Sequence, residues 1–198
     1  PSPQLPPPQQ HCSSAATPTP ASMPCKVLHV LRHGVAVHNQ PNAHQLPPAS
    51  LLDPSLTVHG VAQANAAKSR IQALRPQLVL TSPLTRALQT ATTVMASPDD
   101  GKHNPTAAAM SPPVILALEI VREAYGALLP DKRRSAAELR AAFSPAVDLS
   151  MLSEEDQCWK AGERETLEAV HGRARILLRE LLPRHERHVL LVSHGVFL

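Results

Sequence analysis

The sequence contains few aromatic residues and few cysteines. Only 2% of its 198 residues are Phe, Trp or Tyr, so the core of a folded domain must be built mainly from Leu, Val, Ile and Ala. Cys12, Cys25 and Cys158 are odd in number and widely spaced, which suits neither a disulfide framework nor a Cys-x-x-Cys metal site. We therefore expect a reducing environment and a cytoplasmic location.

Net charge and long apolar runs are also scarce. The formal charge is only +3, too small to predict binding to nucleic acid or to an acidic membrane surface. No apolar run approaches the length of a membrane span, and no secretory signal is visible. We expect neither a nucleic-acid partner nor a membrane, and the composition leaves the oligomeric state open. Because the first residue is Pro, we expect a fragment or a processed form.

The chain is long enough for one domain with a substantial core. Residues 1–24 are dense in Pro, Ser, Gln and Thr, and such a segment buries too little apolar surface to offset its ordering entropy. We predict a disordered tail there. A Pro-rich docking ligand and an organellar leader are the alternatives, although the segment lacks the Arg residues of a leader. Residues 25–198 form the predicted folded domain.

Short apolar runs alternate with segments of helical periodicity, which predicts an α/β fold. The helical segments are residues 57–74, 82–96 and 166–182, and Ser82 followed by Pro83 predicts an N-cap at the start of the second. We expect a three-layer α/β/α sandwich around a mainly parallel sheet. Its predicted buried strands are Cys25–Leu31, Gln77–Thr81, Val114–Ala117 and His188–Val192.

Chemically active residues follow three of these four strands. Arg32-His33-Gly34 ends the first, Ser82 leads to Arg86 after the second, and Ser193-His194-Gly195 ends the last. In such sheets the ligands bind outside the carboxyl ends of the strands. Arginines and a neutral imidazole gathered there would suit a phosphate dianion beside a nucleophile, and the bare glycine would let a backbone N–H approach the same anion.

Three motifs extend this pattern into a family resemblance over residues 26–198. "LRHGVAVHN" resembles the nucleophile motif of the histidine phosphatase superfamily, also called the phosphoglycerate mutase-like family. "TSPLTRALQTA" resembles its second arginine motif, and "LLVSHGVFL" its second histidine motif. Within this family, "REAYGALLPDKRRS" and "VDLSMLSEEDQCW" resemble the plant, algal and fungal members.

The resemblance implies a role for each matching residue. His33 matches the nucleophile, which accepts the phosphoryl group on a neutral ring. Arg32 and Arg86 match the two arginines that clamp the phosphoryl oxygens. His194 matches the second histidine, which contacts the transferring group. Asn39 matches an asparagine that follows the first motif and is expected to contact phosphate.

The general acid has two candidates, Glu119 and Glu123. In the family this residue often follows Arg, so Arg122-Glu123 is the better match and Glu123 is preferred. The match is imperfect, since classical mutases have Glu-x-x-x-Gly and this chain has one residue fewer before Gly126.

Other polar residues have a structural explanation as well as a functional one. His29, His33 and His38 could be imagined as a metal cluster, but no acidic residue or cysteine joins them at ligand spacing, and we predict no metal and no cofactor. His29 is expected at a strand edge with a hydrogen bond. The run Asp131–Arg134 is expected to be a solvated loop, with recognition of substrate phosphate as the alternative. Arg164 is expected to make helix-end ion pairs of small energetic value.

The resemblance implies hydrolysis of a small phosphate monoester through a phosphohistidine on His33. Phosphoglycerate mutase activity is the first alternative, but Val35 and Ala36 stand where mutases carry Glu and Ser. A catalytically silent domain that binds a phosphate ligand is the second. Because the family continues beyond the last motif, we also expect the sequence to be truncated at its C-terminal end.

Overall fold

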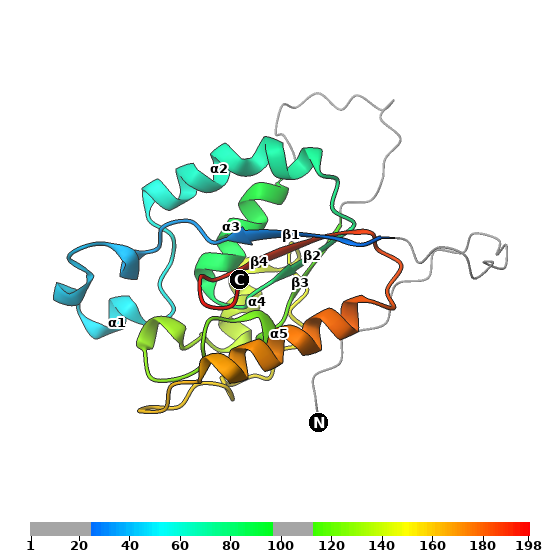
Figure 1. The fold of residues 1–198 in the computed structure, drawn as a ribbon. Helices are drawn as coiled ribbons and strands as arrows, with labels where there is room; N and C mark the ends of the chain where they lie inside the picture. Colours follow the sequence, from blue (N-terminus) through cyan, green and yellow to red (C-terminus); the bar gives the residue numbers. More distant parts are fainter. Residues whose placement is uncertain (1–24, 97–112) are drawn as a thin grey trace, which may run out of the picture.

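The computed structural model describes residues 25–96 and 113–198. The predicted disordered tail, residues 1–24, lies outside this range. A four-stranded sheet crosses the domain, with all neighbouring strands parallel and the order β1-β4-β2-β3 (Figure 1). The strands are β1 (Val27–Arg32), β2 (Leu78–Thr81), β3 (Val114–Ala117) and β4 (His188–Ser193).

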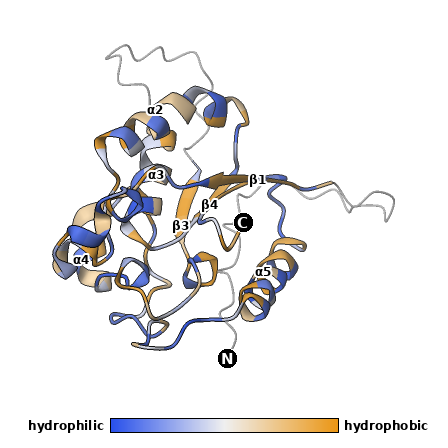
Figure 2. Cartoon of the chain, turned by 60° about the vertical axis from the view of Figure 1, so that its left-hand side comes forward, coloured by the Kyte–Doolittle hydropathy of each residue, from blue (hydrophilic) through white to orange (hydrophobic). Residues whose placement is uncertain are grey.

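Helices cover both faces of this sheet, which confirms the predicted three-layer α/β/α sandwich. In Figure 1, α2 (Val58–Ala73) and α3 (Thr85–Met95) lie above the sheet, and α5 (Leu167–Leu181) lies below it. Alternate residues of β4 enter opposite cores: Leu190 and Val192 pack with α2, α3 and α4 (Ala136–Phe143), while Val189 and Leu191 pack with α5. Hydrophobic colour accordingly concentrates in the sheet in Figure 2.

Short helical elements occupy the long connections. They are α1 (Pro48–Leu51) and the 3₁₀ turns η1 (Val37–Asn39), η2 (Ala43–Gln45), η3 (Glu119–Val121) and η4 (Leu129–Asp131). These turns, and α4, have no long apolar period and were absent from the sequence prediction. Three of the turns lie near the carboxyl ends of the strands, where they shape the candidate site.

The first strand is less buried than predicted. β1 is an edge strand that pairs only with β4, and none of its residues is fully buried. Val30 is 59% exposed, because an edge strand receives less cover from the helices than a central one. The prediction of a buried first strand was therefore wrong, whereas β2 is buried throughout.

Helix α3 begins later than Ser82 and Pro83 predict. Its first residue is Thr85, and its N-cap residue, Leu84, offers no side-chain acceptor. The fully buried carboxylate of Asp53 takes this role: it accepts hydrogen bonds from the Thr85 backbone N–H at 2.8 Å and from Thr85 Oγ1 at 2.7 Å. A residue remote in sequence thus anchors the helix that carries Arg86.

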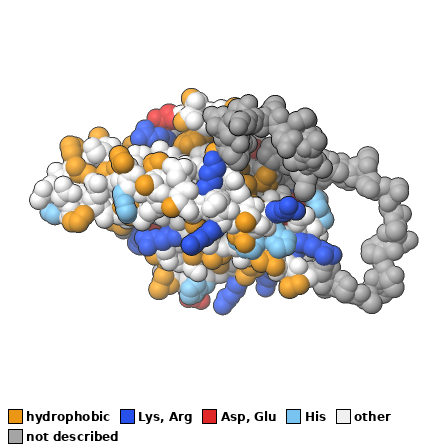
Figure 3. Space-filling view, turned by 90° about the horizontal axis from the view of Figure 1, so that it is seen from above, with side chains coloured by type: hydrophobic (Ala, Val, Ile, Leu, Met, Phe, Trp, Pro, Cys, Tyr) orange, Lys and Arg blue, Asp and Glu red, His pale blue; other side chains and the backbone are white. Residues whose placement is uncertain are grey.

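The surface gives no sign of a large basic patch on the face drawn in Figure 3. Lys and Arg side chains there are separated by hydrophobic and neutral ones. Within residues 25–96 and 113–198, no helix combines the length and apolar character needed to cross a membrane.

Candidate active site

The sheet brings the two motif histidines together at the carboxyl ends of its strands. His33 directly follows β1 and His194 directly follows β4, and these strands are paired neighbours. Their ring centroids lie 4.9 Å apart. Arg86, in the first turn of α3 after β2, donates from Nε to His33 Nε2 at 3.3 Å. The topology therefore assembles three of the predicted site residues.

The hydrogen bonds of His33 fix its tautomer. Its Nδ1 lies 2.7 Å from the carbonyl oxygen of Gly34, which can only accept, so Nδ1 carries the proton. Nε2 then keeps its lone pair and accepts from Arg86. Burial, followed by the positive charge of Arg86, lowers the pKa of His33 to about 3, so the ring is neutral at physiological pH. This is the state that a nitrogen nucleophile requires.

The two candidate clamp arginines have different surroundings. Arg86 is 1% exposed; its Nη1 donates to Pro130 O at 2.5 Å and its Nη2 pairs with Asp131 Oδ1 at 3.0 Å. Arg32 is exposed and lies beside Gly195, where an added Cβ would stand 3.6 Å from its guanidinium carbon. Arg86 is thus held in place by its partners, whereas Arg32 lies at the solvent-exposed edge of the candidate site.

His194 is buried without a hydrogen-bond partner. Its side chain is fully covered, and neither ring nitrogen has a partner among the described residues. Burial, followed by the charge of Arg86, lowers its pKa well below the usual value. Buried polar atoms are normally hydrogen-bonded, so an unpaired ring beside a nucleophile fits a group that contacts a ligand.

The structure separates the two carboxylates that compete as general acid. Glu119 is committed to ion pairs with Arg122 at 2.9 Å and Arg133 at 2.5 Å. Glu123 makes no ion pair with any described residue; its Oε1 accepts from the Ala124 N–H at 3.0 Å, and its Oε2 lies 3.5 Å from the Val196 N–H in the loop after His194. The geometry therefore favours Glu123.

The expected approach of the Gly34 N–H to an anion receives a different structural explanation, whereas the phosphate contact of Asn39 stays a prediction. The N–H of Gly34 donates to Thr90 Oγ1 at 3.2 Å, so it does not face an anion. Glycine is needed there because an added Cβ would lie 2.5 Å from the carbonyl oxygen of Gly60 at the start of α2. Asn39, the predicted phosphate contact, uses its Oδ1 to accept from the Ala36 N–H at 3.0 Å.

The run Asp131–Arg134 is not the solvated loop that its charge density predicts. Asp131 is 5% exposed and pairs with both Arg86 and Arg164, the latter at 2.5 Å. Arg133 is 2% exposed and donates to backbone oxygens of Ser153 and Glu155. The expected helix-end pairing of Arg164 was also wrong. A single sequence shows which residues are charged, but not which of them are buried together.

The histidines imagined as a metal cluster do not gather. His29 stacks on His188 with its Nε2 3.2 Å from His188 Nδ1, which confirms a strand-edge histidine with a hydrogen bond. Among the described residues, no group of three His, Cys, Asp or Glu is placed to hold a metal ion.

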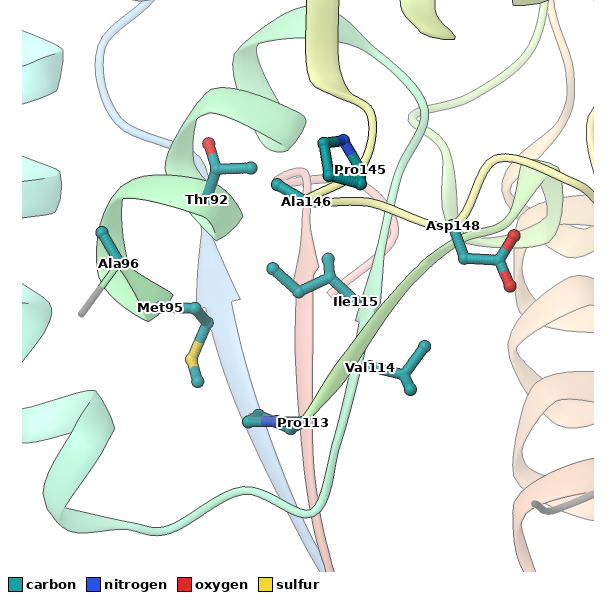
Figure 4. A pocket seen from close by; sticks show the side chains of 9 residues that line it. All are labelled: Thr92, Met95, Ala96, Pro113, Val114, Ile115, Pro145, Ala146 and Asp148. Carbon is teal, nitrogen blue, oxygen red and sulfur yellow. The ribbon is translucent and has the colours of Figure 1, made fainter. Parts of the chain in front are cut away.

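An apolar hollow elsewhere in the domain does not belong to this site. Its lining includes Met95 at the end of α3, Val114 at the start of β3 and Pro145 (Figure 4). The start of β3 is the end of the sheet opposite to His33 and His194. The hollow therefore has no part in the chemistry proposed below.

Comparison with known proteins places this geometry in a family. A model of the histidine phosphatase superfamily (branch 1) matches residues 28–103. Phosphoglycerate mutase-like protein 1 of Arabidopsis thaliana is 33% identical over 198 residues, covering 88% of this chain and 70% of that protein. A phosphoglycerate mutase-like protein of the same plant is 29% identical over 197 residues, covering 88% and 72%. The chain belongs to the histidine phosphatase superfamily.

Solved structures agree with this assignment. A mycobacterial glucosyl-3-phosphoglycerate phosphatase in complex with inorganic phosphate has a TM-score of 0.50 and 26% identity, over 85% of this chain and 72% of that one. An Escherichia coli protein proposed to be an alpha-ribazole-5'-P phosphatase has a TM-score of 0.53 and 20% identity, over 86% and 74%, which shows the fold alone. Together these findings support an enzyme of the phosphatase or mutase type.

Proposed function

We propose that this chain hydrolyses a small phosphate monoester through a phosphohistidine on His33. The observation that carries the proposal is the unprotonated Nε2 of a neutral, buried His33, held 3.3 Å from the Arg86 guanidinium. A phosphate dianion placed against Arg86 would meet this nitrogen and the unpaired ring of His194.

Each residue has a defined step in this reaction. Arg86 and Arg32 bind the non-bridging oxygens, and His33 Nε2 attacks phosphorus as the bond to the ester oxygen breaks. The carboxylic acid of Glu123 gives its proton to the leaving alkoxide. The resulting carboxylate then removes a proton from water, whose oxygen attacks the phosphohistidine and releases inorganic phosphate. His33 returns to its neutral form.

Hydrolysis is preferred over mutase activity because Val35 and Ala36, which directly follow Gly34, offer no polar side chain to a retained product. Ala36 is fully buried and forms an isolated bridge with Leu56, while the carbonyl oxygen of Val35 accepts from Thr57 N–H. The phosphatase neighbour bound to inorganic phosphate also supports a small phosphorylated substrate. A cytoplasmic location stays a prediction.

Incubation with a panel of phosphate esters tests the proposal. Wild type should release phosphate and carry acid-labile phosphate on His33, whereas His33→Ala should do neither. His29→Ala is the matched control, since that ring stacks on His188 away from the reacting nitrogen. Wild type without turnover and without phosphohistidine would overturn the proposal in favour of a silent binding domain. Conversion of 3-phosphoglycerate into 2-phosphoglycerate would instead establish mutase activity.

A further inference from the structure

A third histidine borders the site, and no role has been assigned to it. His38 lies in the 3₁₀ turn Val37–Asn39, and its ring centroid stands 6.2 Å from that of His33, with the rings tilted by 46°. The ring is half-buried. The charges of Arg86, Asp131 and Arg32 all act on it, so it belongs to the same electrostatic cluster as the nucleophile.

The neighbouring asparagine fixes the tautomer of this ring. Because the Ala36 N–H can only donate, the Asn39 atom that lies 3.0 Å from it must be the carbonyl oxygen. The amide nitrogen, Nδ2, is then the atom that lies 3.1 Å from His38 Nε2, and it must donate. Nε2 is therefore an acceptor, and the proton of neutral His38 sits on Nδ1.

This leaves a buried donor without an acceptor. Nδ1 of His38 has almost no exposed surface and no hydrogen-bond partner among the described residues. A buried N–H without an acceptor is costly, and beside a candidate phosphate site an oxygen of the bound phosphoryl group would supply the acceptor. Burial, followed by the charge of Arg86, lowers the pKa of His38 to about 4, so the ring is neutral.

We propose that His38 binds substrate: its Nδ1–H donates to an oxygen of the bound phosphoryl group, beside Arg86. Asn39 is the positioning residue that holds the required tautomer, since its Nδ2 donates to His38 Nε2. This inference rests on the proposed function and adds to it a neutral, directional donor for the phosphate monoester.

Calorimetric titration with inorganic phosphate tests the contact. His38→Ala should weaken phosphate binding by about 10- to 100-fold, the usual value of a hydrogen bond to a charged acceptor. His38→Asn places an amide N–H where Nδ1 stands and should restore most of the affinity. His38→Gln places its amide at the Nε2 position and should bind as weakly as the alanine variant. His44→Ala, an exposed histidine in the next turn, is the control and should match wild type.

Three results would overturn the inference. The first is phosphate affinity in His38→Ala equal to that of wild type. The second is equal affinity in the Asn and Gln variants. The third is a long-range ¹H–¹⁵N spectrum of wild type with the His38 proton on Nε2, which needs no variant and is unaffected by misfolding. If wild type hydrolyses esters and His38→Ala has unchanged phosphate affinity, only this inference is contradicted. If wild type neither hydrolyses esters nor binds phosphate, the proposed function is overturned as well.

Discussion

The carboxylate of Asp131 fixes the guanidinium of Arg86 through a buried ion pair. Its Oδ1 lies 3.0 Å from Arg86 Nη2, and both side chains are almost fully buried. The second carboxylate oxygen pairs with Arg164, so the anion is fixed from two directions. Arg86 is thereby turned with its Nε toward His33. Arg86 is thus oriented before any ligand arrives, and its orientation depends on an ion pair between residues 45 positions apart in the sequence.

Removal of this carboxylate should damage both stability and catalysis. Asp131→Ala leaves a buried guanidinium without its counter-ion, and breaking a buried pair in this way costs about 3–5 kcal/mol of unfolding free energy. Without its ion pair, Arg86 should also be less well oriented toward the phosphoryl group, which lowers kcat/KM. Urea unfolding and steady-state kinetics measure the two effects. Glu163→Ala, which removes the exposed pair with Lys160, should cost no more than about 1 kcal/mol.

The two candidate acids should respond differently to amidation. Glu123→Gln removes the proton donor and should lower kcat for alkyl phosphates by about 10²- to 10⁴-fold. For p-nitrophenyl phosphate, whose leaving group needs little protonation, the loss in the phosphorylation step should be much smaller. Glu119→Gln should keep the wild-type dependence on the leaving group and lose stability, since it weakens the pairs with Arg122 and Arg133. The opposite pattern would identify Glu119 as the acid.

Stability should fall as the solution becomes mildly acidic. Burial lowers the pKa values of three histidines in the folded protein: His33, His38 and His194. Below pH 6.5, the usual pKa of histidine, the unfolded chain therefore binds protons that the folded chain does not. Each ring should therefore remove up to about 1.4 kcal/mol per pH unit below pH 6.5, until its folded pKa is reached. Denaturant unfolding between pH 7.5 and 5 measures the slope, and His33→Ala should make it shallower. A slope unchanged by that variant would contradict the depressed pKa.

Gly34 should not tolerate a side chain. An alanine there would bring Cβ within 2.5 Å of Gly60 O, and overpacking of this kind costs about 1–3 kcal/mol. Activity should fall with stability, because Gly34 O holds the tautomer of His33. Gly172→Ala in α5 is the matched control: nothing lies within 4 Å of its added Cβ, and it should stabilise the protein by about 0.4–1 kcal/mol. Thermal unfolding and phosphate release would compare them.

The elements of the fold that could be predicted were those marked by apolar runs or by helical periodicity in the sequence. Apolar runs located all four described strands to within about two residues. For β2, β3 and β4 the reason is burial on both faces of the sheet, which imposes a continuous apolar pattern. The start of α3 was misplaced because its cap comes from Asp53, and no local pattern connects Asp53 with Thr85. The exposure of β1 was missed because an apolar run does not reveal which strand lies at the edge of the sheet.

The site was predictable where its residues directly follow strands. His33, Arg86 and His194 could be grouped because parallel strands end at one edge, and the structure brings them together. The ion pair of Asp131 with Arg86 and the tautomer of His38 were not predicted, since the first joins residues distant in sequence and the second depends on the hydrogen-bond direction of Asn39. A signal for His38 existed in the sequence: it lies five residues after His33 in a turn that must stay close to the nucleophile.

Among the described strands, β4 comes latest in the sequence yet lies between β1 and β2 in the sheet, and this order has a consequence for biosynthesis. Until His188–Ser193 leaves the ribosome, β1 has no partner in the sheet, and the two facing histidines belong to separate halves of the nascent polypeptide. The pairings of β4 with β1 and with β2 join segments that are distant in the sequence, so the candidate site forms late in folding. For the proposed reaction, turnover should begin only after β4 has entered the sheet.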